Sequence, residues 1–172
     1  MNSKLEFIFR NVPIHIIQLT TSLLPNSDIS NKIRGSLVRP FLGSCGKNFK
    51  LANGVIINKP GQLHVGKNVY IAHNAWINAI GGILIGNDVI VGPMCVLATS
   101  KHKFIDGKVT SIGINGPITI GDGSWLASHV TITDNVKIGK GNMVAANAVV
   151  TSSTEDNCLY AGVPAKAIKS IK

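Results

Sequence analysis

The sequence has 172 residues, which is enough for one domain with a substantial buried core. Its composition, 45% hydrophobic and only 15% charged with 18 glycines, excludes a largely disordered chain and indicates many tight turns. The formal net charge of +9 is compatible with an anionic partner, but no run of Lys and Arg with interleaved aromatic residues points to nucleic acid.

The cysteines and the apolar segments predict a location. Cys45, Cys95 and Cys158 are odd in number and widely spaced, so they suggest neither a disulfide framework nor a CxxC metal site. By its phase in the repeat described below, Cys95 is expected to be a small core residue. We expect no signal peptide and no spanning helix, because no apolar run approaches ~20 residues. The prediction is a cytoplasmic protein whose membrane contact is peripheral at most.

Residues 1–48 are predicted to form a helical N-terminal cap. Apolar residues recur at helical spacing in two places: Leu5, Ile8, Phe9 and Val12, and later Ile29, Ile33 and Leu37. Pro13 is expected to interrupt the first helix, and Ser27 or Asp28 can cap the second. Two interpretations are open. The helices cover the blunt end of a repeat domain, which we favour, or they form a basic amphipathic arm that touches a membrane.

Residues 49–155 follow a six-residue repeat, which is clearest between residues 118 and 151. An aliphatic residue recurs there at every sixth position: Ile120, Leu126, Ile132, Ile138, Val144 and Val150. Two positions before each lies a second residue expected to point inward: Ile118, Ser124, Val130, Val136, Asn142 and Ala148. This period fits neither a helix nor a long strand, but it fits short strands joined by tight corners.

The same rhythm begins at Leu51 and Ile57 and is displaced twice. Extra residues around 59–61 and 81–82 shift the frame. We expect a corner with a short bulge at each place, in which glycine takes the strained backbone angles.

A longer interruption separates Leu97 from Ile120, because their spacing is five residues more than a multiple of six. A loop at about residues 101–117 must therefore leave the repeat, and an excursion of this length is typical of a functional segment. After the last repeat, residues 156–172 are predicted to form a C-terminal tail of the same domain.

The text ITIGDGSWLASHVTITDNVKIGKGNMVAANAVVT, followed by AGVPAKAIK, resembles the hexapeptide-repeat acyltransferases. The resemblance covers about residues 51–169 and is closest to the branch that O-acetylates sugars and polysaccharides. It implies an all-β fold, a left-handed parallel β-helix, and it alone supplies the handedness because parallel crossovers are normally right-handed. It also implies acetyl-CoA as acyl donor, a saccharide acceptor, no metal, and a homotrimer with each active site between subunits.

His102 is the candidate general base. A hydroxyl group is too weakly acidic to attack a thioester unaided, whereas a neutral imidazole can accept its proton as the bond forms. The resemblance implies this role for a histidine where the loop leaves the coil, without a covalent acyl-enzyme. Many relatives have Asp directly after this histidine, but here the residue is Lys103. The group that orients the imidazole is then Asp106 or a backbone carbonyl, and the sequence leaves both open.

The resemblance also implies residues for coenzyme A. Ser128 and Ala146 match positions whose backbone lines the pantetheine arm, and their separation of 18 residues, three repeats, would stack them on one edge. Trp125 faces out of the coil by phase, where relatives have an aromatic residue beside the acetyl group; a subunit contact is the other interpretation. The remaining matches are Thr151 and Ser152, lower in the same groove, and Lys166 and Lys169, near the nucleotide phosphates.

For the acceptor, Asn74 and Asn78 resemble polar positions that hold sugar hydroxyls, although asparagine is also common at corners because it tolerates positive φ. The predicted function is acetyl transfer from acetyl-CoA to a sugar hydroxyl, in surface polysaccharide biosynthesis.

Three alternatives remain open. The first is N-acetylation of an amino sugar or a drug, and the second is a non-catalytic β-helix that serves as a scaffold or binding module. The third is a zinc enzyme of the γ-type carbonic anhydrase class, which shares the β-helix. It would need His73, His102 and His129 to converge on the metal, and their spacing is unlike that family's close histidine pair.

Overall fold

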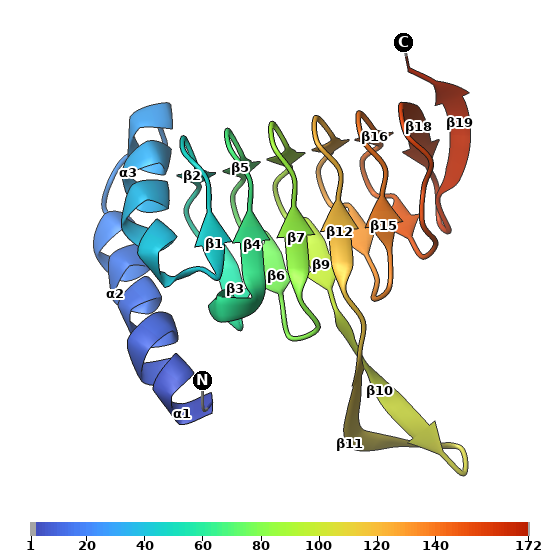
Figure 1. Cartoon of the computed structure of the whole chain (residues 1–172), viewed down its shortest axis with the longest axis horizontal. Helices are drawn as coiled ribbons and strands as arrows, with labels where there is room; N and C mark the ends of the chain where they lie inside the picture. The colour runs from blue at the N-terminus through green and yellow to red at the C-terminus, as the bar shows by residue number, and fades with distance from the viewer. Residues whose placement is uncertain (1–2, 172) are drawn as a thin grey trace.

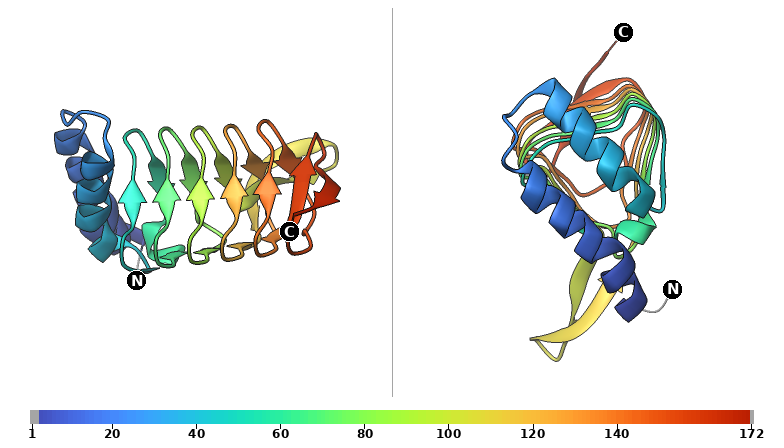
Figure 2. Two further views of the ribbon diagram at one scale, coloured as in Figure 1. Left: turned by 90° about the horizontal axis from the view of Figure 1, so that it is seen from above. Right: turned by 90° about the vertical axis from the view of Figure 1, so that its left-hand side faces the viewer.

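Residues 3–171 are described in the computed structural model. Short parallel strands wind into a three-sided solenoid, helices cross its N-terminal end, and one hairpin projects from its side (Figures 1 and 2). The predicted left-handed parallel β-helix is confirmed.

Each side of the solenoid is one sheet. Sheet A contains β1 (Ser44–Cys45), β4 (Leu63–Val65), β7 (Ile83–Ile85), β12 (Ile118–Ile120) and β15 (Lys137–Ile138). Sheet B contains β2 (Lys50–Leu51), β5 (Tyr70–Ile71), β8 (Ile90–Val91), β13 (Trp125–Leu126), β16 (Met143–Val144), β18 (Cys158–Ala161) and, antiparallel to β18, β19 (Lys166–Ser170). Sheet C contains β3 (Ile56–Asn58), β6 (Trp76–Asn78), β9 (Val96–Ala98), β14 (Thr131–Ile132) and β17 (Val149–Val150). The corners between sheets form the AB, BC and CA edges.

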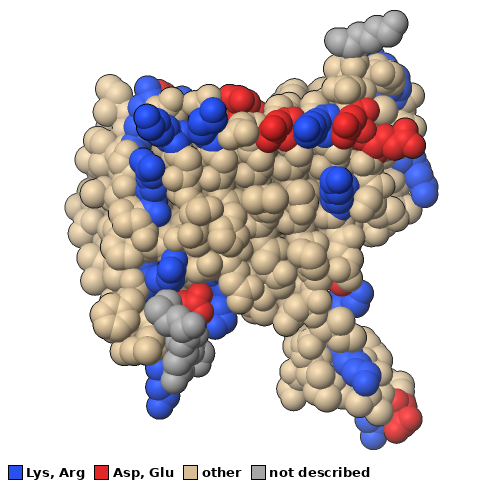
Figure 3. Space-filling model, in the orientation of Figure 1, with Lys and Arg blue, Asp and Glu red and all other residues tan. Residues whose placement is uncertain are grey.

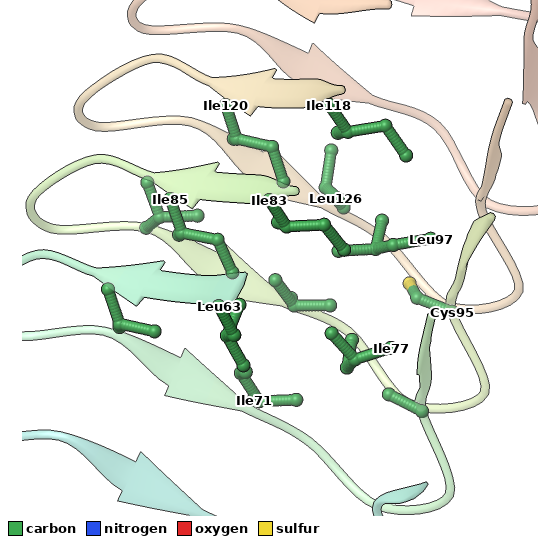
Figure 4. Close-up of a cluster of buried hydrophobic side chains, with 14 of the residues drawn as sticks. Leu63, Ile71, Ile77, Ile83, Ile85, Cys95, Leu97, Ile118, Ile120 and Leu126 are labelled. Carbon is green, nitrogen blue, oxygen red and sulfur yellow. The ribbon is translucent and has the colours of Figure 1, made fainter. Parts of the chain in front are cut away.

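The core lies inside the coil and contains the residues that the repeat predicts. All twelve inward positions between Ile118 and Val150 are at most 1% exposed, and Figure 4 shows part of this stack. Cys95 is fully buried in it, as expected. The two polar members of the series are paired: Ser124 Oγ donates to the Gly139 carbonyl at 2.8 Å, and Asn142 Nδ2 donates to the Glu155 carbonyl at 2.7 Å. Burial therefore leaves neither side chain without a partner.

The displaced repeats are longer coils. Strand partners Lys50, Tyr70 and Ile90 follow one another at intervals of 20 residues, whereas Trp125 and Met143 are 18 apart. The extra residues lie at the CA edge, where Gly82 has a φ of 89°, as expected for a glycine corner. At the earlier displacement the left-handed residue is Lys59, with a φ of 55°, followed by the 3-10 turn η3 (Pro60–Gln62). The expectation of glycine is therefore wrong at that corner.

The predicted loop is a two-stranded hairpin. Strands β10 (Ser100–Ile105) and β11 (Lys108–Asn115) pair antiparallel and project from the CA edge (Figure 1). Asp106 and Gly107 form its two-residue turn with φ values of 49° and 73°, the conformation that favours Asp-Gly in tight hairpins.

The N-terminal helices are α1 (Ser3–Glu6), the π-helical turn η1 (Phe7–Asn11), α2 (Val12–Thr21) and α3 (Asp28–Val38), followed by the 3-10 turn η2 (Arg39–Phe41). The regular α-helix is interrupted just before Pro13, as expected, although the chain stays helical. Pro13 lies in the first turn of α2, and the wider π-helical turn before it carries the chain past the missing N–H. Ser27 is the N-cap of α3, its Oγ accepting from the Ser30 N–H at 3.2 Å. No helix in residues 3–171 is long and apolar enough to cross a bilayer.

These helices cover the blunt end of the solenoid, as we favoured, with a docking side that combines polar residues with a few apolar ones. The residues of α3 that face the first coil are buried: Ser30, Asn31, Arg34, Gly35 and Val38. Strand β1 already pairs with β4 at Ser44, so the first coil begins a few residues before the predicted boundary at residue 49.

Unpaired backbone carbonyls explain the polar underside. The backbone groups of a coil point alternately to the coils on either side. The Lys50 N–H donates to the Val69 carbonyl of the next coil and the Lys47 carbonyl accepts from the Asn68 N–H, each at 2.9 Å, whereas the carbonyls of Leu51 and Val55 in the first coil point towards the cap. Cap side chains satisfy them: Gln18 Nε2 donates to the Val55 carbonyl at 2.6 Å and Arg34 to the Leu51 carbonyl at 3.3 Å. Buried carbonyls need such partners, so the docking face must be polar.

Candidate functional site

The candidate base lies where the hairpin leaves the solenoid. His102 is the third residue of β10, its side chain is exposed, and its backbone pairs with Gly113 of β11. The next pair is Phe104 with Val109, so three residues of β11 stand opposite one residue of β10. This irregularity turns the β11 backbone towards the histidine, as β-bulges beside functional sites often do.

A backbone carbonyl holds the imidazole. His102 Nδ1 lies 3.0 Å from the Thr110 carbonyl oxygen in the bulge. A carbonyl can only accept a hydrogen bond, so Nδ1 carries the hydrogen and the neutral ring has its lone pair on Nε2. Asp106 occupies the hairpin turn instead. Of the two possibilities that the sequence left open, the structure has the backbone carbonyl, and Thr110 is a residue that sequence reasoning missed.

Thr110 is itself held in place. Its hydroxyl donates to the Lys103 carbonyl at 2.8 Å and accepts from the Ile112 N–H at 3.3 Å, so one side chain closes the bulge on both sides. The only signal in the sequence was a threonine in a β-rich hairpin, which does not reveal a bulge.

The base of the hairpin is tied to neighbouring coils. Asn78 Nδ2 donates to Ser100 Oγ at 2.8 Å, and the Thr99 carbonyl accepts from the Gly116 N–H at 2.9 Å. Lys101 Nζ and Asp134 Oδ2 form an ion pair at 2.9 Å, although their geometry is not that of a hydrogen bond. The Asp134 carboxylate is buried at the CA edge. The segment on either side of His102 is therefore fixed, although the hairpin itself is exposed.

The predicted coenzyme A corners stack on one edge. Ser128 and Ala146 occupy successive turns of the BC edge, where the Asn147 N–H donates to the Ser128 carbonyl at 3.0 Å. The segment after β18 continues the stack, because the Gly162 carbonyl accepts from the Val149 N–H at 3.0 Å and the Ala165 N–H donates to the Val149 carbonyl at 2.8 Å. This brings the AGVPAK segment to the edge that carries Ser128.

The other predicted cofactor residues lie in two places, on sheet B and at the CA edge. Trp125 is 44% exposed on the outer face of sheet B, between Ile90 and Met143 of the neighbouring strands. Lys166 and Lys169 are exposed on β19. Thr151 and Ser152 are also exposed, but they follow β17 at the CA edge. Within one chain the width of sheet C separates these two residues from Ser128, so a groove containing all of them would need a second subunit.

The two acceptor candidates also differ. Asn74 is exposed at the BC edge with a φ of 60°, so the left-handed corner by itself accounts for asparagine there. Asn78 is 5% exposed, and its amide is engaged at the hairpin base. A role of either residue in acceptor binding stays a prediction.

The histidines of the zinc alternative do not come together. His73 and His129 belong to the BC edge, where His73 Nε2 lies 3.2 Å from Asn26 Oδ1, whereas His102 is on the hairpin. Within residues 3–171 no three His, Cys, Asp or Glu side chains are grouped so that they could hold a metal ion.

A hollow of about 600 Å³ lies elsewhere, between α3 and sheet B. Its lining includes Asp28, Lys32, Lys50 and Tyr70, which belong to the cap and the first two coils. It contains neither His102 nor the stacked corners, so we do not take it as the candidate site.

Comparison with known proteins now defines the family. Residues 117–152 match the model for the bacterial transferase hexapeptide (six repeats). The galactoside O-acetyltransferase of Escherichia coli is 30% identical over 143 residues, which cover 80% of this chain and 68% of that protein.

Solved structures agree over nearly the whole chain. A maltose O-acetyltransferase from Clostridium difficile superposes with a TM-score of 0.85 at 26% identity, over 99% of this chain and 90% of that one. A hexapeptide-repeat acetyltransferase from Vibrio cholerae, solved with acetyl coenzyme A, gives 0.84 at 25% identity, over 99% and 91%. The chain belongs to the hexapeptide-repeat acyltransferase family.

Proposed function

We propose that the protein transfers an acetyl group from acetyl-CoA to a hydroxyl group of a sugar, with His102 as general base. The observation that carries this proposal is the hydrogen bond from His102 Nδ1 to the Thr110 carbonyl, which leaves Nε2 as the free acceptor on an exposed ring. The Escherichia coli and Clostridium difficile relatives act on a galactoside and on maltose, which supports a saccharide acceptor.

The proposed reaction is a direct displacement, in which His102 takes one proton from the acceptor and returns it to the leaving group. Nε2 of His102 takes the proton of the acceptor hydroxyl as its oxygen attacks the thioester carbonyl. The tetrahedral intermediate expels the thiolate of coenzyme A, which recovers the proton from Nε2. The Thr110 carbonyl stabilises the imidazolium formed in between, because Nδ1–H keeps its acceptor throughout.

The stacked corners of the BC edge are proposed to hold the donor. A cofactor lying along Ser128 and Ala146 would run parallel to the solenoid axis, with Trp125 towards its acetyl end and Lys166 near its phosphates. Lysine side chains offset phosphate charge through charge-assisted hydrogen bonds.

Each site is proposed to lie between subunits of a homotrimer. In one chain the hairpin that carries His102 projects from the solenoid (Figure 2). It leaves at the CA edge, whereas Ser128 and Ala146 lie on the BC edge, so sheet C separates them. A base from one subunit and a groove from its neighbour would complete the site. Thr151 and Ser152 would then face the groove of that neighbour.

The wider role that we propose is O-acetylation in surface polysaccharide biosynthesis in the cytoplasm. The sugar-acetylating relatives support O-acetylation of a saccharide. The cytoplasmic location is supported by three free thiols, Cys45, Cys95 and Cys158, which are typical of a reducing compartment.

The rate of coenzyme A release tests acetyl transfer and the role of His102. Release of free coenzyme A thiol is measured with a panel of sugars, amino sugars and no acceptor, for wild type, His102→Ala and the hairpin control Lys103→Ala. We expect acceptor-dependent release that falls by about 10²–10⁴-fold in His102→Ala and by little in the control. Full activity of His102→Ala would instead indicate an amine acceptor. No release with any acceptor, together with no calorimetric binding of coenzyme A, would leave a non-catalytic scaffold.

Mixing two inactive variants tests the shared site. His102→Ala removes the base, and Ala146→Trp places a large ring on the proposed groove. If base and groove come from different subunits, one site in four of randomly mixed trimers is intact, so the mixture should recover about a quarter of wild-type activity. Recovery of none, although mass spectrometry shows mixed oligomers, would place both groups in one chain.

A further inference from the structure

The outer surface of the N-terminal cap is apolar. Along α1, η1, α2 and the following turn, apolar side chains at helical spacing are 36–89% exposed: Leu5, Ile8, Phe9, Val12, Ile16, Leu19 and Leu23. On α3 they are Ile29, Ile33 and Leu37, at 71%, 42% and 46%. We call these ten side chains the cap face. Seven of them are the residues whose spacing predicted the helices, and none of the ten belongs to the buried core.

This orientation is the reverse of an ordinary surface helix, whose apolar stripe faces the core. It follows from the carbonyls of the first coil, which require the polar side of the cap beneath them. Gln18 and Arg34 occupy that side, and Ile14 and Val38 supply its apolar contacts. The cap face lies outside the buried core, so the exposed parts of its side chains remain available to a partner.

The cap face is large for the surface of a soluble domain. At roughly 150–200 Å² for each fully exposed side chain, ten side chains at about half exposure present on the order of 1,000 Å² of apolar surface. The largest apolar patch of a typical monomer is about 300–600 Å². Seen end-on, α2 and α3 lie side by side across the end of the solenoid, so their outer sides form one broad surface (Figure 2).

Charge decides which partner suits this surface. Residues 4–50 contain seven Lys and Arg, of which only Arg34 is fully buried beneath the cap, and two acidic residues, both of them paired. Glu6 lies 3.0 Å from Lys59 Nζ, and Asp28 lies 2.8 Å from Lys32 Nζ. In Figure 3 basic side chains border the cap end, while most acidic side chains visible in that view lie towards the later coils and the hairpin tip.

A second copy of the chain would bring two positive surfaces together, because a symmetric dimer pairs the same patch with itself. An anionic bilayer instead attracts the basic border and accepts the apolar side chains between the headgroups. We propose that the cap face docks on the surface of an anionic membrane, with the helices lying in the plane of the bilayer and the solenoid axis standing away from it.

Sedimentation with vesicles tests this proposal. Wild-type protein is mixed with phosphatidylcholine vesicles, or with vesicles that also contain phosphatidylglycerol, at low and high salt. The variants are Leu19→Glu and Ile33→Glu on the cap face. The matched control is Leu84→Glu, which adds the same charge to an exposed leucine, 52% exposed, on sheet A. Circular dichroism and melting temperature confirm that each variant is folded, and light scattering gives the oligomeric state.

We expect wild type and Leu84→Glu to sediment with the anionic vesicles, less so at high salt, and each cap variant to bind at least tenfold more weakly. Wild type that stays in the supernatant, or cap variants that bind as wild type does, would overturn the proposal. The proposal would also be overturned if wild type did not bind vesicles but formed a larger oligomer that Leu19→Glu dissociated. The cap face would then bind a second copy of the chain. None of these results depends on acetyl transfer, which is assayed separately with a water-soluble acceptor.

Discussion

Replacing Gly35 by alanine should weaken the contact between the cap and the solenoid. Gly35 lies on the buried side of α3, where a Cβ atom would come 2.1 Å from the Phe49 carbonyl oxygen, 2.8 Å from its carbon and 3.2 Å from Lys50 Cα. All three atoms belong to the backbone, so no flexible side chain can move aside. The helix must shift outwards by about 1 Å to restore ordinary contact distances.

Two effects of this substitution oppose each other. Alanine in a helix interior is favoured over glycine by about 1 kcal/mol. Overpacking of a well-packed contact typically costs 1–3 kcal/mol, and the short distance to a rigid carbonyl places Gly35→Ala at the upper end, about 3 kcal/mol. The shift would also lengthen the 3.3 Å hydrogen bond from Arg34 to the Leu51 carbonyl. We expect a net loss of about 2 kcal/mol in the free energy of unfolding.

Thermal melting and hydrogen exchange measure this loss. For a chain of this size 2 kcal/mol corresponds to a decrease of roughly 4–8 °C in Tm, with faster exchange concentrated in α3 and β2. The control is Ser36→Ala, the exposed neighbour on the same helix, which gains helix propensity without a clash and should melt at or slightly above the wild-type temperature. A Gly35→Ala protein that melts as Ser36→Ala does would refute the close approach of α3 to the first coil.

Three further results are expected. Asn142→Ala leaves the Cys158 N–H and the Glu155 carbonyl without their partner and should lower the free energy of unfolding in urea by about 2–4 kcal/mol; a change below 0.5 kcal/mol would contradict the buried network. Burial raises the pKa of the Cys95 thiol to about 11, so only about one in a thousand is ionised at pH 8, and iodoacetamide should label Cys95 only after denaturation; labelling of the native protein at the free-thiol rate would disagree. Lys166→Gln combined with Lys169→Gln should weaken coenzyme A binding about tenfold in calorimetry but leave binding of pantetheine, which lacks the nucleotide phosphates, unchanged; equal losses for both ligands would argue against phosphate contacts.

The repeat in the sequence determined the solenoid and the direction of its side chains. Ser124 and Asn142 show how strong this signal is, because both are polar and yet both are buried where their phase placed them. Each short strand pairs with the equivalent strand of the neighbouring coil. The position of a residue within its six-residue repeat is therefore enough to fix whether its side chain points inward. The resemblance identified Ser128 and Ala146, and the same arithmetic predicted that their corners stack.

The sequence could not determine how the ends and the hairpin are built. Apolar spacing predicted the cap helices, but which side of them docks depends on carbonyls of the first coil that only the wound chain exposes. Likewise, the sequence identified His102 but not Thr110, because a β-bulge is set by the register between two strands and leaves no mark in either. The solenoid was thus decided by local periodicity, whereas the orientation of the cap and of the candidate base was decided by hydrogen bonds between distant segments.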